Sequence, residues 1–178
     1  MKARNKVIAT VIAGLLSSTA AFAATDGSLG ATSTGQVDLD LEVLESVQIT
    51  ALDDINFGSY GGANSGDINQ GDAYCVYVSG GEDYTITPTS SNGDFNLVGA
   101  TNSDEIAYTV KFAGASTGAA SQAAVAYNTA SATFTGDDAT DCGAANNASI
   151  DVSITEAAIR AVSADDYSDT LVLLVNPI

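Results

Sequence analysis

The sequence feature that most constrains the fold is the stretch at residues 36–44, in which apolar and acidic residues alternate strictly from 37 to 43. The apolar positions are Val37, Leu39, Leu41 and Val43, and the acidic positions between them are Asp38, Asp40 and Glu42. In an extended strand, a period of two places the apolar side chains on one face and the carboxylates on the other. The segment therefore predicts a strand that needs an apolar groove, supplied either by its own domain or by another molecule.

The residues ahead of this strand indicate export. Three basic residues precede an apolar run at residues 7–16 that is too short to span a bilayer, and Ala21-Phe22-Ala23 follows it as a cleavage pattern. We expect a signal peptide at residues 1–23, a flexible tail at 24–35, the alternating strand at 36–44 and one domain at 45–178. A retained membrane helix is the alternative interpretation of the first segment. No later segment is predicted to be embedded in a membrane.

The charge of the exported chain argues against several classes of function. Beyond residue 23 only Lys111 and Arg160 are basic, against 22 acidic residues, which gives a formal charge of −20. Binding to nucleic acid or to an anionic membrane requires Lys and Arg, so neither is expected. The chain has no His and no Trp, which removes the commonest general base and metal ligand. We therefore expect no enzyme activity and no cofactor.

The only two cysteines are Cys75 and Cys142. One cysteine pair in an exported chain favours a structural disulfide. The alternative is a thiol nucleophile, but the chain has no His to activate it and no C-x-x-C spacing.

Runs of Thr, Val, Ile and Tyr broken by Gly, Asn, Asp and Ser predict an all-β fold. The Gly-rich stretch at 58–72 is predicted to be a loop, Gly80-Gly81-Glu82-Asp83 a hairpin turn, and residues 157–162 a helical turn. Residues 55–58 are expected to add a short third extended piece, and weak strands are expected near 123–127 and 132–134. The main expected strands are 46–51, 73–79, 84–89, 95–98, 106–112, 149–155 and 170–176.

The last expected strand is apolar on both faces, which is unusual at a chain terminus. Such a strand favours a further strand beside it. Together with the alternating segment near the start, it suggests that an extended segment of one chain completes the sheet of another.

Three motifs in order resemble the pilins of the archaic chaperone–usher pathway, which carry a spore-coat-protein-U-like domain. The motifs are Thr34-Gly35-Gln36-Val37-Asp38-Leu39-Asp40-Leu41-Glu42-Val43, Ile55-Asn56-Phe57-Gly58 and Asp166-Tyr167-Ser168-Asp169-Thr170-Leu171-Val172-Leu173-Leu174-Val175. The resemblance implies an incomplete immunoglobulin-like sandwich that is completed by donor-strand exchange. It also implies a periplasmic chaperone, an outer-membrane usher and other pilin subunits as partners, and a place in a cell-surface fimbria that serves adhesion and biofilm formation.

The resemblance also implies roles for individual residues. Val37, Leu39, Leu41 and Val43 would be the donor side chains. The acceptor groove would be lined by Leu171, Leu173 and Val175, or by Val172 and Leu174 on the opposite face. The chain departs from the family because its first domain strand lacks a cysteine and because Pro177, near the end, cannot donate to a ladder.

Other functions rest on weaker patterns. Asp137, Asp138 and Asp141 could attract Ca²⁺, but the EF-hand spacing is missing. Paired acids could serve a glycosidase, but no aromatic cleft is apparent. The alternative to a fimbrial subunit is a tip or secreted binding module, in which a self-completed β-sandwich binds a ligand such as a carbohydrate.

Overall fold

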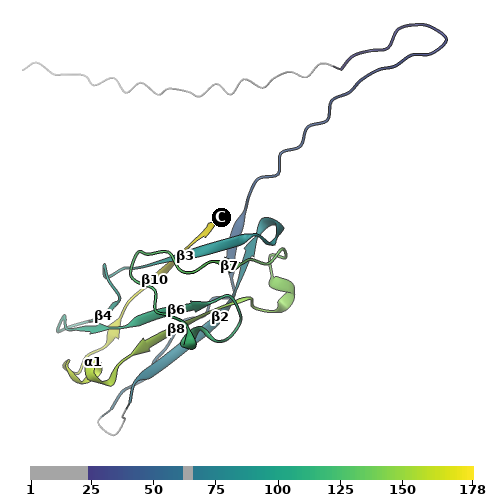
Figure 1. The fold of residues 1–178 in the computed structure, drawn as a ribbon. Helices are drawn as coiled ribbons and strands as arrows, with labels where there is room; N and C mark the ends of the chain where they lie inside the picture. The colour runs from purple at the N-terminus through teal and green to yellow at the C-terminus, as the bar shows by residue number, and fades with distance from the viewer. Residues whose placement is uncertain (1–23, 62–65) are drawn as a thin grey trace, which may run out of the picture. The chain divides into compact units, whose positions relative to one another are not determined.

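The computed structural model describes residues 24–61 and 66–178, in two units that are treated separately: a leading segment that ends at Val43, and a domain at 44–178. The predicted signal peptide lies outside the described residues. The regular secondary structure of the domain is almost entirely β-strand (Figure 1), which confirms the all-β prediction. Its strands are β1 Val47–Thr50, β2 Ile68–Val78, β3 Asp83–Ser90, β4 Asn96–Gly99, β5 Glu105–Ala107, β6 Thr109–Ala113, β7 Phe134–Thr135, β8 Ala148–Ile154, β9 Tyr167–Ser168 and β10 Leu171–Pro177.

The strands form three antiparallel sheets, with the orders β1-β2-β8-β6, β10-β3-β7 and β5-β4-β9. One short α-helix, α1 (Glu156–Arg160), follows β8, and three single 3-10 turns lie in the connections: η1 Ser79–Gly81, η2 Ala119–Ser121 and η3 Cys142–Ala144. Both β1 and β10 lie at the edge of their sheets.

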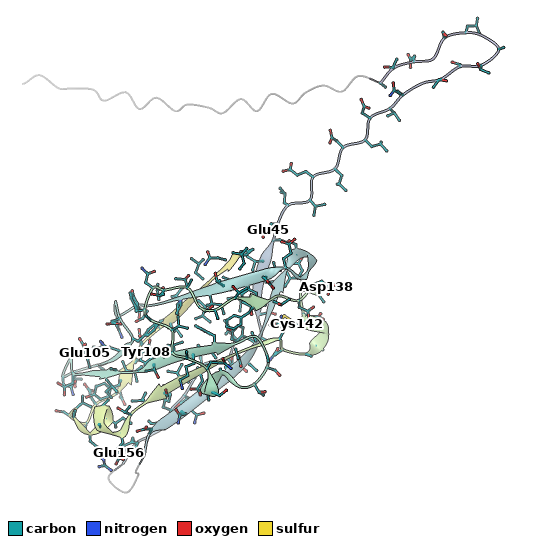
Figure 2. All side chains as sticks on the ribbon, in the orientation of Figure 1. Glu45, Glu105, Tyr108, Asp138, Cys142 and Glu156 are labelled. Carbon is teal, nitrogen blue, oxygen red and sulfur yellow. A yellow bond between two sulfur atoms is a disulfide. The ribbon has the colours of Figure 1, made fainter. Side chains whose placement is uncertain are left out.

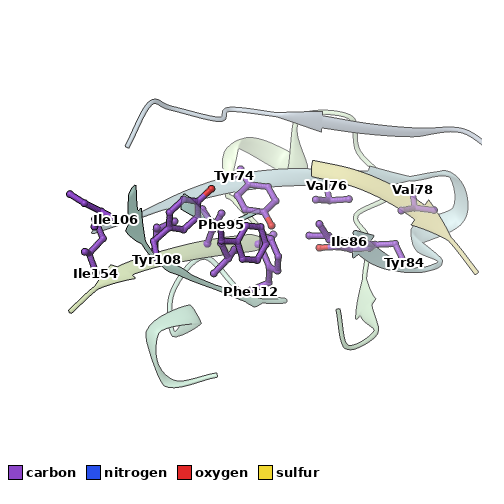
Figure 3. Close-up of a cluster of buried hydrophobic side chains, with 14 residues drawn as sticks. Tyr74, Val76, Val78, Tyr84, Ile86, Phe95, Ile106, Tyr108, Phe112 and Ile154 are labelled. Carbon is purple, nitrogen blue, oxygen red and sulfur yellow. The ribbon is translucent and has the colours of Figure 1, made fainter. Parts of the chain in front are cut away.

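The core lies between the sheets (Figure 3), and in several strands it is built from alternate residues. In β3, Tyr84 and Ile86 are fully buried while Thr85 and Thr87 are only partly covered. This alternation arises because successive side chains of a strand point to opposite faces. The pattern predicted for residues 106–112 is confirmed, because its apolar set is buried: Ile106, Tyr108, Val110 and Phe112.

The extended stretch at 105–113 changes sheets halfway. Its first part, β5, pairs with β4, and its second part, β6, pairs with β8. Tyr108 lies at the change and donates its backbone N–H to Phe95 O at 2.9 Å. The stretch was predicted as one strand, because a change of pairing partner leaves the apolar alternation unaltered.

The hairpin predicted at residues 80–83 is wrong. β2 and β3 belong to different sheets, and η1 carries the chain from one sheet to the other. Gly80 and Gly81 have φ values of 77° and 67°, which residues with a side chain adopt only at a cost. The same glycines would suit a hairpin turn, so the local sequence does not distinguish the two connections.

The loop predicted at 58–72 is also too long, because β2 begins at Ile68. A side chain at Gly71 would place its Cβ 2.5 Å from the carbonyl oxygen of Ile150 on β8. This glycine therefore marks a close approach of two strands rather than a loop. No strand forms over residues 55–58, and the predicted helical turn appears slightly earlier, as α1. The weak strand expected near 132–134 appears as β7.

A disulfide joins Cys75 of β2 to Cys142 of η3, which confirms the predicted bridge. Figure 2 places Cys142 at the opposite end of the domain from Glu105. The bridge holds the residue 136–146 loop against β2, where Asp137 N donates to Val76 O and Val78 N donates to Asp137 O, each at 3.0 Å.

Within the leading segment, Thr25 and Gln36 exchange two backbone hydrogen bonds of 3.0 and 2.9 Å. The four apolar side chains of the alternating stretch are exposed, at 72–91% of their full area: Val37, Leu39, Leu41 and Val43. The structure gives these residues no ladder partner within the described chain.

Candidate strand-accepting groove

An open groove runs along the domain beside the edge strand β10. Its first part has a volume of about 470 Å³, and its second part, of about 740 Å³, continues toward β9 and α1. The two parts share lining residues, so they form one continuous furrow: Asp54, Ile55, Phe57, Leu97 and Asp169. We call this furrow the groove.

One wall of the groove is β10. Leu171 and Leu173 line the groove, and Val175 packs against the core beyond them. Val172 and Leu174 point the other way and are 52% and 58% exposed. Of the two faces considered for β10, the face with Leu171 and Leu173 is therefore the one on the groove.

The backbone of β10 is unpaired along the groove. β10 pairs only with β3 among the described residues, and Ser91 N donates to Thr170 O at 2.9 Å where this ladder begins. Because hydrogen-bonded positions alternate along an antiparallel pair, residues 172, 174 and 176 bond to β3. The intervening residues direct their N–H and C=O groups toward the open edge: Leu171, Leu173 and Val175.

Two prolines are placed to match this arrangement. Pro88 of β3 lies opposite Leu173, at a position whose backbone groups point away from β10. Its carbonyl accepts from Asn128 N on that side at 2.9 Å, and the N–H that proline lacks is therefore not needed for the ladder with β10. Pro177 ends β10 at a position that faces the open edge. The donors that β10 offers to an added strand therefore end at Val175.

The opposite wall is the stretch at residues 52–57, which follows β1. Ala51 has a φ of 60° and ends the strand. Asp53 N then donates to Asp72 Oδ2 at 2.9 Å, while Ile55 and Phe57 pack against the core. This stretch forms no ladder with any described strand, and β10 pairs with β3 only on its far side. Both borders of the groove therefore present backbone edges that no described strand pairs with.

Asp169 is the polar centre of the groove. Its Oδ2 accepts from Ser90 Oγ at 2.5 Å and from Tyr108 Oη at 2.6 Å, and its Oδ1 accepts from Ser91 Oγ at 2.9 Å. Burial alone would raise the pKa of Asp169, but the hydrogen bonds from Ser90, Tyr108 and Ser91 outweigh it and lower the pKa. Burial, together with the bond to the carboxylate, raises the pKa of Tyr108. The carboxylate thus ties the start of β10 to β3 and to the β5–β6 stretch.

The floor of the groove is apolar and includes Ile150 and Val152 of β8 and Leu97 of β4. Sequence reasoning identified β10 but not the other wall or Asp169. Residues 52–57 carry no periodic signal in the sequence, and a single Asp such as Asp169 has no pattern that would place it beside a groove. Only the three-dimensional arrangement brings these residues together.

The described residues include no group of three or more His, Cys, Asp or Glu side chains that could hold a metal ion. In the acidic loop considered for Ca²⁺, Asp137 Oδ1 accepts from Ala139 N at 2.8 Å and Asp141 Oδ1 accepts from Gly143 N at 3.1 Å. These two carboxylates therefore cap turns of their own loop. In the described part of the chain, no helix is long and apolar enough to cross a membrane.

Comparison with known proteins adds no relative. No family model matches the chain, and no curated protein matches it. The resemblance to pilins, and the donor and acceptor roles that it implies, therefore stay predictions.

Proposed function

We propose that this chain is a structural subunit of a chaperone–usher surface fimbria, in which residues 37–43 of one copy insert into the groove of a neighbouring copy. The observation that carries the proposal is the open groove beside β10, which has an apolar floor and is bordered on both sides by backbone edges that no described strand pairs with. An incomplete immunoglobulin-like sandwich, closed by donor-strand exchange, is the fold that this proposal assigns to the domain.

The leading segment has the properties that such a groove requires. Its four apolar side chains alternate along the chain and are exposed. Burying two Val and two Leu would contribute about 6–12 kcal/mol, before entropy costs, at roughly 1.5–3 kcal/mol for each side chain. Backbone hydrogen bonds to β10 would add specificity for an extended segment.

Under this proposal, the chain binds several partners one after another during assembly. A periplasmic chaperone would cover the groove after export, and an outer-membrane usher would exchange it for the next subunit. The fimbria would then serve adhesion and biofilm formation outside the cell. A self-completed binding module would instead fold residues 37–43 into its own groove and stay monomeric.

The test is to replace Leu39 and Leu41 by Asp. We expect this variant to stay folded but to form no polymers, because two charged side chains would have to enter an apolar groove. Polymers are measured as ladders that resist SDS at room temperature and collapse on boiling. The matched control is Asp38→Asn with Asp40→Asn on the opposite face of the same segment, which keeps the ladders.

Two results would contradict the proposal. One is a wild-type chain that runs as a single band under these conditions, as a self-completed module would. The other is an unchanged ladder in the Leu39→Asp, Leu41→Asp variant.

A further inference from the structure

We infer that cations from solution, not side chains of the protein, balance the charge at each joint between copies, so that ionic strength sets how fast copies join. The inference rests on the proposed function, because it concerns the carboxylates that strand insertion brings together.

The incoming segment carries a row of carboxylates. When its apolar side chains face into the groove, the residues between them come to lie at the groove's mouth, since the period is two. Those residues are Asp38, Asp40 and Glu42.

The receiving groove carries carboxylates as well. Four of the residues that line its first part are acidic, and no Lys or Arg is among the described residues that line this part: Asp53, Asp54, Asp72 and Asp169. On the solvent side of β10, next to where the incoming carboxylates would lie, Val172 and Leu174 provide no opposite charge.

The two basic residues beyond the predicted signal peptide have other partners. Lys111 donates from Nζ to Ala120 O at 2.8 Å, beside β6. Arg160 lines the second part of the groove, where its Nε lies 2.6 Å from Glu156 Oε1 and its guanidinium lies over the ring of Tyr60. Neither is placed at the first part of the groove, where the acidic residues gather.

In the first part of the groove, joining two copies therefore brings like charges together with no Lys or Arg among the described lining residues. The range of this repulsion depends on salt, because the Debye length falls from about 30 Å at 0.01 M to about 8 Å at 0.15 M ionic strength. At low salt the repulsion acts before the apolar side chains reach the groove, and we expect it to slow association, the reverse of electrostatic steering.

The experiment uses the exported protein, unfolded in urea, which adds no ionic strength, with its disulfide intact and refolded at NaCl concentrations from about 20 mM to about 300 mM. The rate at which SDS-resistant ladders appear is measured for wild type and for two variants. Asp38→Asn with Asp40→Asn removes charge from the incoming segment. Glu82→Gln with Asp138→Asn changes the net charge equally at exposed positions outside the groove.

We expect the wild-type rate to rise at least about tenfold over this range. The Asp38→Asn, Asp40→Asn variant should polymerise faster at low salt and lose most of its salt dependence, while the Glu82→Gln, Asp138→Asn variant keeps the wild-type dependence. Comparing the variants separates screening from the general effect of salt on apolar association.

The outcomes distinguish the two proposals. Ladders that form at a rate independent of salt, or with the same salt dependence in both variants, would overturn the inference and leave the proposed function intact. The absence of wild-type ladders at every salt concentration would overturn both.

Discussion

At the scale of single residues, Asp169 combines two features that usually conflict: a place beside an apolar surface and a negatively charged side chain. It lines a groove with an apolar floor, yet its carboxylate accepts hydrogen bonds from three side chains and from the backbone N–H of Thr170. A partly buried charge is tolerated when hydrogen bonds replace the lost water. Asp169 therefore fixes the start of β10, and with it the wall of the groove.

This arrangement predicts how stability depends on pH. The pKa of Asp169 is lowered in the folded state, so its contribution is fully present above the unfolded pKa of about 3.9 and is lost as pH falls through the lower folded pKa. Asp169→Asn should cost about 1–2 kcal/mol near neutral pH, after allowance for solvent screening. The difference from wild type should shrink as the solution is acidified toward the folded pKa.

The measurement is urea unfolding of both proteins at several pH values, with Asp138→Asn as an exposed control. An Asp169→Asn variant as stable as wild type at neutral pH, or a deficit that grows on acidification, would contradict this role.

At the scale of elements, the two faces of β10 should respond differently to the same substitution. Leu173→Asp places a charge on the groove and should abolish polymers. Leu174→Asp, at a position already 58% exposed, should leave the domain folded and should keep the ladders in about 300 mM NaCl, which screens the added charge from the incoming carboxylates. The readouts are the SDS-resistant ladder and, for folding, the circular dichroism of each variant.

If Leu173→Asp itself unfolds the domain, Leu173→Ala provides a milder test and should weaken the ladder on heating. Equal effects at positions 173 and 174 would refute the assignment of the groove face.

The elements also show where sequence reasoning succeeds and where it fails. Periodicity predicted β3 and the apolar face of residues 106–112, because burial on one side of a strand imposes a period of two. It predicted the position of β8 but not its burial, because Asp151, expected on the outer face, is buried as well. It failed at residues 80–83 and at Tyr108, because a strand has the same pattern whichever sheet it joins. Residues 52–57 have no ladder at all, so their place on the groove follows only from the fold.

At the scale of the whole molecule, the disulfide joins positions 67 residues apart, and it should stabilise the domain mainly by restricting the unfolded chain. The chain-entropy model gives about 4 kcal/mol for a loop of this length. We expect Cys75→Ser with Cys142→Ser to lose about 2–5 kcal/mol in the free energy of unfolding and to lower the yield of exported protein.

The check is guanidinium unfolding of wild type with and without a reductant. The reductant should lower the stability of wild type to that of the double variant and leave the variant unchanged. Two thiols that react with an alkylating reagent in the native protein would contradict the bridge.

For the molecule as a whole, composition predicted the all-β class and the cysteine pair predicted the bridge. The groove could not be derived from composition or from the cysteine pair, since it depends on how edge segments of different sheets are placed. The alternating segment predicted that a groove is needed, and the structure contains one that is open.

The placement of the two basic residues has a consequence for resistance to proteases. Proteases of trypsin specificity cut after Lys or Arg, and beyond residue 23 the sequence offers them only Lys111 and Arg160. Lys111 lies within the ladder between β6 and β8, and Arg160 lies in α1. Cleavage at Lys111 would require local unfolding of the strand, so we expect a protease of trypsin specificity to leave most of residues 24–178 intact.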